Sequence, residues 1–266
     1  RFWLWKSGDV GAFAERFAGS ADLFKKNDRL PHSTLNFITA HDGFVMRDLV
    51  SYNEKHNEAN GEENRDGRNE NYSYNHGVEG STENLSRIER NTIENDRLFA
   101  QCGLLMSLLL ANGTPMLLAG DEFGNTQYGN NNAYCQDNEI TWLKWADFNT
   151  ELFELTKQTI AARKQIQSLQ NDAWWSNENV AWFNLHGEPM QLADWQNLGV
   201  KALQILLDAK WLLLVNAKAE SQTFILPSCA VSQWKALVGT TNLTFISSQE
   251  VAVSSMAFCL LKKTDC

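Results

Sequence analysis

Two polar pairs in this sequence, His41-Asp42 and Asp121-Glu122, could carry chemistry because each follows a short apolar run. If those runs are parallel strands, the pairs lie at the carboxyl ends of neighbouring strands, where barrel enzymes carry their catalytic side chains. Carboxylates in that position can accept hydrogen bonds from the hydroxyl groups of a sugar or another polyol. An Asp-Gly turn and an Asp helix cap are the structural alternatives for the same residues.

A long polar segment and an unusual number of tryptophans also bear on a polyol-binding cleft. Residues 53–91 are rich in Asn and show neither helical nor strand periodicity. Loops of that length in compact domains are usually functional or disordered. The chain has 10 Trp, whose exposed faces can stack on sugar rings, whereas buried Trp are large core residues. Composition alone favours the core interpretation.

The elements expected to position the two pairs alternate between strand and helix. The short apolar runs at 35–40 and 114–120 are typical of buried parallel strands. The apolar spacing within 92–111 predicts a helix between them, and further helices are expected at 9–18 and 150–169. This order of strand, helix and strand predicts an α/β region.

The pattern changes beyond residue 170. Short β-type runs separated by polar turns occur at 180–185, 211–217, 223–226, 234–238 and 255–261. They predict an antiparallel β-sandwich with no strong helix. The chain is therefore expected to combine α/β and all-β parts, with a first domain at 1–169 and a second at 170–266.

Composition excludes several classes of partner. Lys and Arg total 23 against 32 for Asp and Glu, and the resulting net charge of -9 is unsuited to binding a phosphate backbone. No apolar run approaches the length of a membrane span. The five cysteines are an odd number without a CxxC motif, which favours reduced thiols and argues against a zinc site. The acids within 60–70 lack the spacing of a calcium loop, so neither a metal nor a cofactor is expected.

Several motifs closely resemble those of bacterial glycogen debranching enzymes of the isoamylase type, which belong to the α-amylase superfamily of glycoside hydrolases. They read NFITAHDGF at 36–44, RDLVSYNEKHN at 47–57, NGE at 60–62, DG at 66–67, GTPMLLAGDE at 113–122 and NNNAYC at 130–135. The resemblance covers about residues 1–165. Over the remainder it extends to the architecture alone.

The resemblance implies a TIM (β/α)8 barrel with three catalytic carboxylates. On motif position, Asp42 corresponds to the residue that stabilises the transition state, and His41 to a neighbour that binds a sugar hydroxyl. Asp121 and Glu122 correspond to the end of the eighth strand, with a supporting or substrate-binding role. The polar loop corresponds to an insertion that shapes the cleft for the branch. A solvated or disordered loop is the alternative.

The nucleophile and the acid/base of such enzymes would lie upstream of Arg1, and the chain begins Arg-Phe-Trp instead of with Met. The sequence is therefore interpreted as the C-terminal portion of a debranching enzyme, holding the last barrel strands and a β-sandwich. The full enzyme is expected to hydrolyse α-1,6 branch linkages of glycogen, limit dextrin or maltodextrin in the cytoplasm. The 266 residues alone are expected to be inactive and to self-associate through the open barrel.

A different class of function stays open. The sandwich could be a non-catalytic carbohydrate-binding module, or a structural module that binds no ligand. The candidate sugar platforms are Trp174, Trp175, Trp182 and Trp195. Packing of these tryptophans against the barrel is the preferred interpretation.

Overall fold

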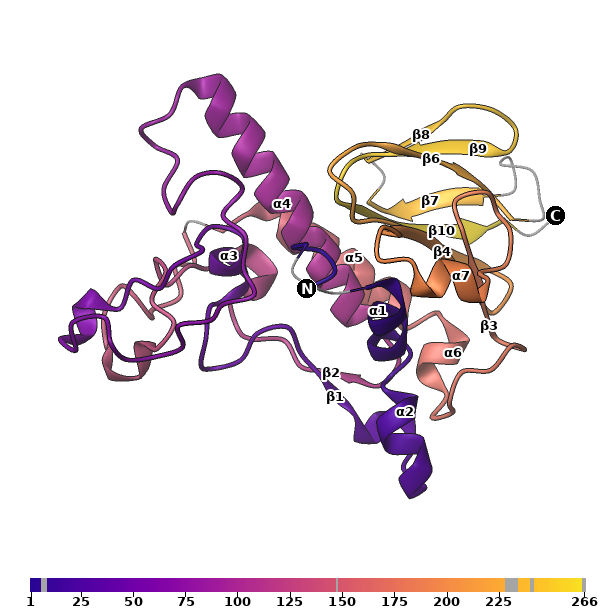
Figure 1. Ribbon diagram of the computed structural model, residues 1–266, viewed down its shortest axis with the longest axis horizontal. Helices are drawn as coiled ribbons and strands as arrows, with labels where there is room; N and C mark the ends of the chain where they lie inside the picture. The colour runs from indigo at the N-terminus through magenta and orange to yellow at the C-terminus, as the bar shows by residue number, and fades with distance from the viewer. Residues whose placement is uncertain (6–8, 147, 228–233, 240–241, 265–266) are drawn as a thin grey trace.

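The computed structural model describes residues 1–5, 9–146, 148–227, 234–239 and 242–264. Helices and long loops form the N-terminal part, and two antiparallel sheets form the C-terminal part (Figure 1). The long helix α4 (Arg87–Leu109) runs between the loops and the sheets. The polar loop segments extend away from α4 on the side opposite the sheets.

Helix α4 begins earlier than the expected residue 92. Ser86 accepts a hydrogen bond from the Glu89 backbone N–H, and the Glu89 side chain accepts from the Ser86 backbone N–H. This capping box fixes the first turn. The second half of α4 is buried on all sides, so its apolar residues continue around the helix, as at Leu104, Leu105 and Met106.

The predicted parallel strands are present but shorter than expected. Strand β1 (Leu35–Asn36) pairs in parallel with β2 (Thr114–Pro115), and α4 connects them. The expectation that 35–40 is a buried strand is wrong, because Leu35 and Phe37 are 56% and 53% exposed. Within the described residues this sheet has these two strands, so the outer edge of β1 is without a paired strand.

The remaining helices frame this unit. They are α1 (Val10–Phe17), α2 (Ala21–Phe24), α3 (Met46–Leu49), α5 (Thr150–Arg163), α6 (Gln167–Gln170) and α7 (Leu192–Gln196). Short 3-10 turns occur at η1 (Lys25–Asn27), η2 (Pro31–Ser33), η3 (Glu58–Asn60), η4 (Asp121–Phe123) and η5 (Ala133–Cys135). Asp9 caps α1 as expected. The single helix predicted at 150–169 is instead broken, because Ile166 is extended and its side chain enters the core.

The antiparallel, β-rich C-terminal part is confirmed. One sheet has the order β3 (Val180–Phe183), β4 (Ala202–Leu207), β5 (Trp211–Asn216), β10 (Ala257–Lys263) and β7 (Trp234–Val238). The other has the order β6 (Gln222–Ile225), β9 (Glu250–Val253) and β8 (Leu243–Phe245). The sequence analysis missed β4, β8, β9 and α7.

The central strand β5 is buried on both faces. Leu212 and Leu214 belong to the core between the two sheets, whereas Leu213 and Val215 belong to the core that also contains α4 residues. Successive strand residues point to opposite faces, so a strand with two buried faces is largely apolar. This is why 211–215 reads as a continuous apolar run.

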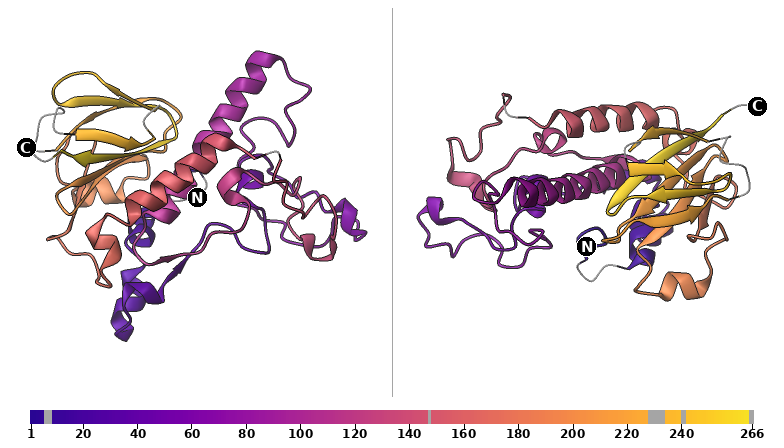
Figure 2. Two further views of the ribbon diagram at one scale, coloured as in Figure 1. Left: turned by 180° about the vertical axis from the view of Figure 1, so that it is seen from behind. Right: turned by 90° about the horizontal axis from the view of Figure 1, so that it is seen from above.

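One apolar core crosses residue 170. Trp3 stacks on Phe258 of β10 with ring centroids 6.2 Å apart, and its indole N–H donates to Ser107 Oγ of α4 at 2.7 Å. A Cβ at Gly103 would lie 2.8 Å from the Trp3 ring, so a glycine is needed at this approach. The helical part and the sheets are therefore joined by buried contacts. Figure 2 shows α4 and α5 side by side.

The described cysteines are free thiols. Cys102 and Cys259 are buried, and Cys135 is exposed. Cys229 and Cys266 lie outside the described residues. Among the helices that the structure describes, none combines the length and hydropathy needed to cross a membrane.

Candidate functional site

The His41-Asp42 pair lies in the loop between β1 and α3, and both side chains are exposed. The turn continues through Gly43, which has φ +83°, a conformation that favours glycine. The Gly43 backbone N–H donates to the Asn131 carbonyl at 2.9 Å. The structure therefore presents the Asp42 carboxylate to solvent in the loop that follows β1.

Asp121 follows β2 and is almost fully buried, at 1% exposure. Its carboxylate accepts a hydrogen bond from the Thr39 hydroxyl and one from the Met46 backbone N–H, the latter at 2.9 Å. Burial raises the pKa of Asp121 to about 6, although these two hydrogen bonds lower it. Asp121 thus binds the chain on both sides of the His41-Asp42 turn, and its burial leaves little of it for a ligand to contact.

Glu122 is half-buried and has a local role. Its carboxylate accepts from the Gly120 backbone N–H at 2.8 Å. Gly120 itself has φ +102° and begins the η4 turn. The structure therefore brings Asp121 to the His41-Asp42 loop, whereas the hydrogen bond of Glu122 stays within its own turn.

The sequence analysis did not select Asp48, a second buried carboxylate. Asp48 lies in α3 and is fully buried. It accepts hydrogen bonds from the Thr126 hydroxyl, the Gln127 N–H at 2.9 Å and the Gly129 N–H at 3.1 Å. Burial raises the pKa of Asp48 to about 6 as well. The local sequence carries little signal for this burial, because the groups that bind Asp48 come from the distant residues 126–129.

The Asn-rich loop is bound to the segment that follows β2. Asn57 and Asn131 exchange two hydrogen bonds of 2.9 Å each. The Asp66 carboxylate accepts from Asn60 at 2.7 Å and from Asn132 at 2.9 Å, and these two amides lower the pKa of Asp66. Several amides of this loop therefore pair with amides of the 130–132 segment and help to fix its conformation.

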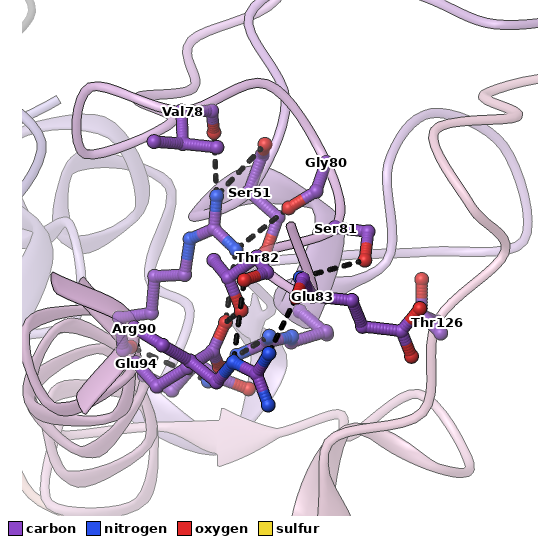
Figure 3. A network of polar contacts seen from close by, with 12 residues as sticks. Ser51, Val78, Gly80, Ser81, Thr82, Glu83, Arg90, Glu94 and Thr126 are labelled. Atoms are coloured by element: carbon purple, nitrogen blue, oxygen red, sulfur yellow. Dashed lines mark hydrogen bonds and ion pairs between the residues drawn. The ribbon is translucent and has the colours of Figure 1, made fainter. Parts of the chain in front are cut away.

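The far end of the same loop is held by Arg97 of α4. Its guanidinium donates to the carbonyls of Gly80 at 2.8 Å, Val78 at 2.5 Å and Asn75 at 3.1 Å. Figure 3 shows Val78 and Gly80 at this network, and Glu94 beside them. The Glu94 carboxylate is 3.1 Å from Arg97 Nη1. Arg97 is fully buried, so its charge needs these partners.

The four candidate tryptophan platforms are half-buried in the structure. Trp175 lies 5.8 Å from the Phe17 ring, and Trp182 meets Trp195 edge to face at 5.7 Å. The Trp174 indole donates to the Arg29 carbonyl at 2.9 Å. These contacts favour the packing interpretation over a sugar-binding surface.

The described residues contain no group of three His, Cys, Asp or Glu side chains arranged to hold a metal ion. Asp66 Oδ2 accepts from the Asn60 and Asn132 amides, and the Lys55 ammonium donates to the Asp66 carbonyl at 2.7 Å.

Residues 175–253 match the family described as the glycogen debranching enzyme C-terminal domain. A curated relative from Haemophilus influenzae, described as a glycogen operon protein GlgX homolog, is 74% identical over 98% of this chain and 39% of its own length. The glycogen debranching enzyme of Klebsiella pneumoniae is 50% identical over 89% of this chain and 35% of its own length. The chain thus spans well under half the length of these relatives.

Solved pullulanase structures share the fold. The pullulanase from Bacillus acidopullulyticus has a TM-score of 0.63 at 17% identity, and the match covers 98% of this chain and 28% of that one. The Paenibacillus barengoltzii pullulanase, in complex with maltohexaose and α-cyclodextrin, has a TM-score of 0.66 at 17% identity, covering 99% and 35%. At these identities the comparison concerns the fold alone.

Proposed function

We propose that this chain is the C-terminal part of a glycoside hydrolase that cleaves α-1,6 branch linkages in glycogen, limit dextrin or related maltodextrins. The observation that carries the proposal is the 74% identity, over almost the whole chain, to a glycogen operon protein. The exposed Asp42 at the carboxyl end of β1 supplies a carboxylate where such a reaction needs one.

Asp42 is proposed to stabilise the transition state. In glycoside hydrolysis the sugar ring becomes positively charged and oxocarbenium-like as the glycosidic bond breaks. A fixed carboxylate that faces the ring interacts more strongly with this charge than with the neutral ground state, and so lowers the barrier. The neighbouring His41 is proposed to bind a sugar hydroxyl, with Asp121 and Glu122 supporting the substrate site from the end of β2.

The β1–α4–β2 unit is proposed to be the end of a (β/α)8 barrel within residues 1–169. Support comes from the parallel pairing of β1 with β2 and from an open groove of about 690 Å³ between β1, α1 and α4, lined in part by Leu35, Phe37 and Leu108. Further strands beside β1 would cover this groove. Residues 170–266 are proposed to form a β-sandwich domain, because an apolar core lies between the two sheets.

The proposal assigns the nucleophile and the acid/base to residues outside these 266. A retaining glycosidase holds two such carboxylates about 5 Å apart, and the motifs of this chain supply neither. The isolated chain is therefore expected to be inactive and to self-associate through the uncovered groove. A role in glycogen metabolism also agrees with a cytoplasmic location.

The test is the release of reducing ends from a branched limit dextrin. The purified chain is compared with a polypeptide of the relatives' full length that carries this sequence. Activity in the longer protein alone supports both the debranching assignment and the missing carboxylates. Activity in neither contradicts the debranching assignment, and activity in both contradicts the assignment of the catalytic carboxylates.

A further inference from the structure

One buried carboxylate spans the loop that carries His41 and Asp42. Thr39 precedes these two residues and Met46 follows them, and both donate a hydrogen bond to Asp121. The bonds go to different oxygens, Oδ2 for Thr39 and Oδ1 for Met46. Asp121 therefore fixes the distance between the two ends of the loop.

The environment of Asp121 strengthens this clamp. Hydrogen bonds to an ionised acceptor are stronger than those between neutral groups, and they gain further where water is excluded. Thr39, Met46 and Asp121 are all buried, at 5%, 0% and 1% exposure. Removal of a donor would leave a buried carboxylate short of a partner, which is costly.

The middle of the loop is held from a different direction. The Gly43 N–H donates to the Asn131 carbonyl, and Asn131 is fixed in turn by its two hydrogen bonds with Asn57. Asp42 therefore lies between the Thr39 and Gly43 anchors. Its own side chain stays exposed and free to face a substrate.

We infer that Asp121 is a positioning residue that sets the orientation of the Asp42 carboxylate through Thr39 and Met46. The inference rests on the proposed function of Asp42 and goes beyond it, because it assigns Asp121 an action through the loop in place of contact with sugar. Misplacement of a reacting group by about 1 Å can cost about 100-fold in rate, so a small shift of this loop is expected to lower turnover.

The experiment uses a polypeptide of the relatives' full length that carries this sequence. Thr39→Val removes one donor and nearly preserves the shape of the side chain. Thr39→Ser keeps the hydroxyl and removes only the methyl group. Asp121→Ala removes both anchors. We expect Thr39→Val and Asp121→Ala to lower kcat by about 10- to 100-fold with KM changed by less than about 3-fold. Thr39→Ser is expected to retain a kcat close to that of the parent.

The matched control is Asp48→Asn. Asp48 is also a buried carboxylate with raised pKa, but its partners are Thr126, Gln127 and Gly129. We expect this variant to lose thermal stability to a similar degree as Thr39→Val, with kcat within about 3-fold of the parent. Amide hydrogen exchange at Gly43 adds a direct measure of the loop. It is expected to accelerate in Thr39→Val and Asp121→Ala and to stay unchanged in Asp48→Asn.

The outcomes separate the inference from the proposed function. If Asp42→Asn abolishes turnover while Thr39→Val and Asp121→Ala leave kcat unchanged, the positioning role is wrong and the function stands. An equal loss of kcat in Asp48→Asn would also overturn the inference, since general destabilisation would then explain it. If Asp42→Asn keeps its activity, the proposed role of Asp42 in the reaction is wrong. Unchanged hydrogen exchange at Gly43 in Thr39→Val would independently refute the positioning role of Asp121.

Discussion

Asn57 and Asn131 are joined by two hydrogen bonds although 74 residues separate them. Asn57 Nδ2 donates to Asn131 Oδ1, and the Asn131 backbone N–H donates to Asn57 Oδ1, each at 2.9 Å. Both residues are buried. The Asn57 side chain thus supplies the hydrogen-bond acceptor for the Asn131 backbone N–H. It connects the polar loop to the segment whose carbonyl binds Gly43 in the Asp42 turn.

Asn57→Ala is expected to destabilise the protein by about 2 kcal/mol, because it leaves a buried N–H and a buried amide oxygen without partners. The free energy of unfolding in urea measures this loss. Asn84→Ala is the control. Asn84 is exposed in the same loop, and its replacement is expected to change stability by less than about 0.5 kcal/mol. Equal effects of the two substitutions would contradict the importance of the Asn57–Asn131 pair.

Arg97→Met is expected to release the 75–80 end of the loop from α4. The substitution leaves the carbonyls of Asn75, Val78 and Gly80 without their donor, and we expect a cost of at least about 3 kcal/mol. Limited proteolysis should cut within 75–83 sooner than in the parent. Arg87→Ala, at the exposed start of α4, should leave the cleavage pattern unchanged. If Arg97→Met is cleaved within 75–83 no sooner than the parent, contacts other than those of Arg97 hold this segment.

The two buried carboxylates predict a specific pH dependence. In the folded protein the pKa values of Asp48 and Asp121 are raised to about 6, whereas an unfolded Asp has a pKa of about 3.9. Between these values the folded state binds more protons than the unfolded state. The contribution of each group to stability therefore falls as the pH rises from about 4 to about 6, and it is constant above that range.

The measurement compares the unfolding free energy of Asp121→Asn and the parent at several pH values. The variant lacks the charge, so its stability relative to the parent should rise from pH 4 to pH 6 and then level off. Glu122 and Asp48 are the charges that raise the pKa of Asp121 further, and both are retained in this variant. A difference that is independent of pH would mean that Asp121 titrates normally.

Asp42→Asn is expected to lower turnover by several powers of ten in the polypeptide of full length, with folding intact. The amide keeps the shape of the side chain but removes the charge that would stabilise an oxocarbenium-like transition state. Reducing-end assays measure the turnover, and circular dichroism checks the fold. Because Asp42 is exposed, its replacement should cost little stability. Only a mild loss of turnover would indicate that Asp42 is a turn residue.

The local sequence pattern predicted an element correctly where burial alone determined its residue types. The apolar run at 211–215 predicted strand β5 because both faces of this strand are buried. Strand β4 escaped the sequence analysis even though its pattern is equally apolar, and the short strands β8 and β9 carry weak signals because they lie in the smaller sheet. The break before α6 depends on the burial of Ile166, which helical periodicity does not reveal.

The sequence by itself determined the positions of the chemical groups: the His41-Asp42 turn after β1, the acids after β2 and the long amide-rich loop between them. Residue type and spacing suffice for these because turns, caps and short strands depend on neighbouring residues. The tertiary structure decided which acids are exposed and which are buried. Asp42 faces solvent while Asp121 lies beneath its loop, because burial and long-range hydrogen bonds depend on segments that only folding brings together.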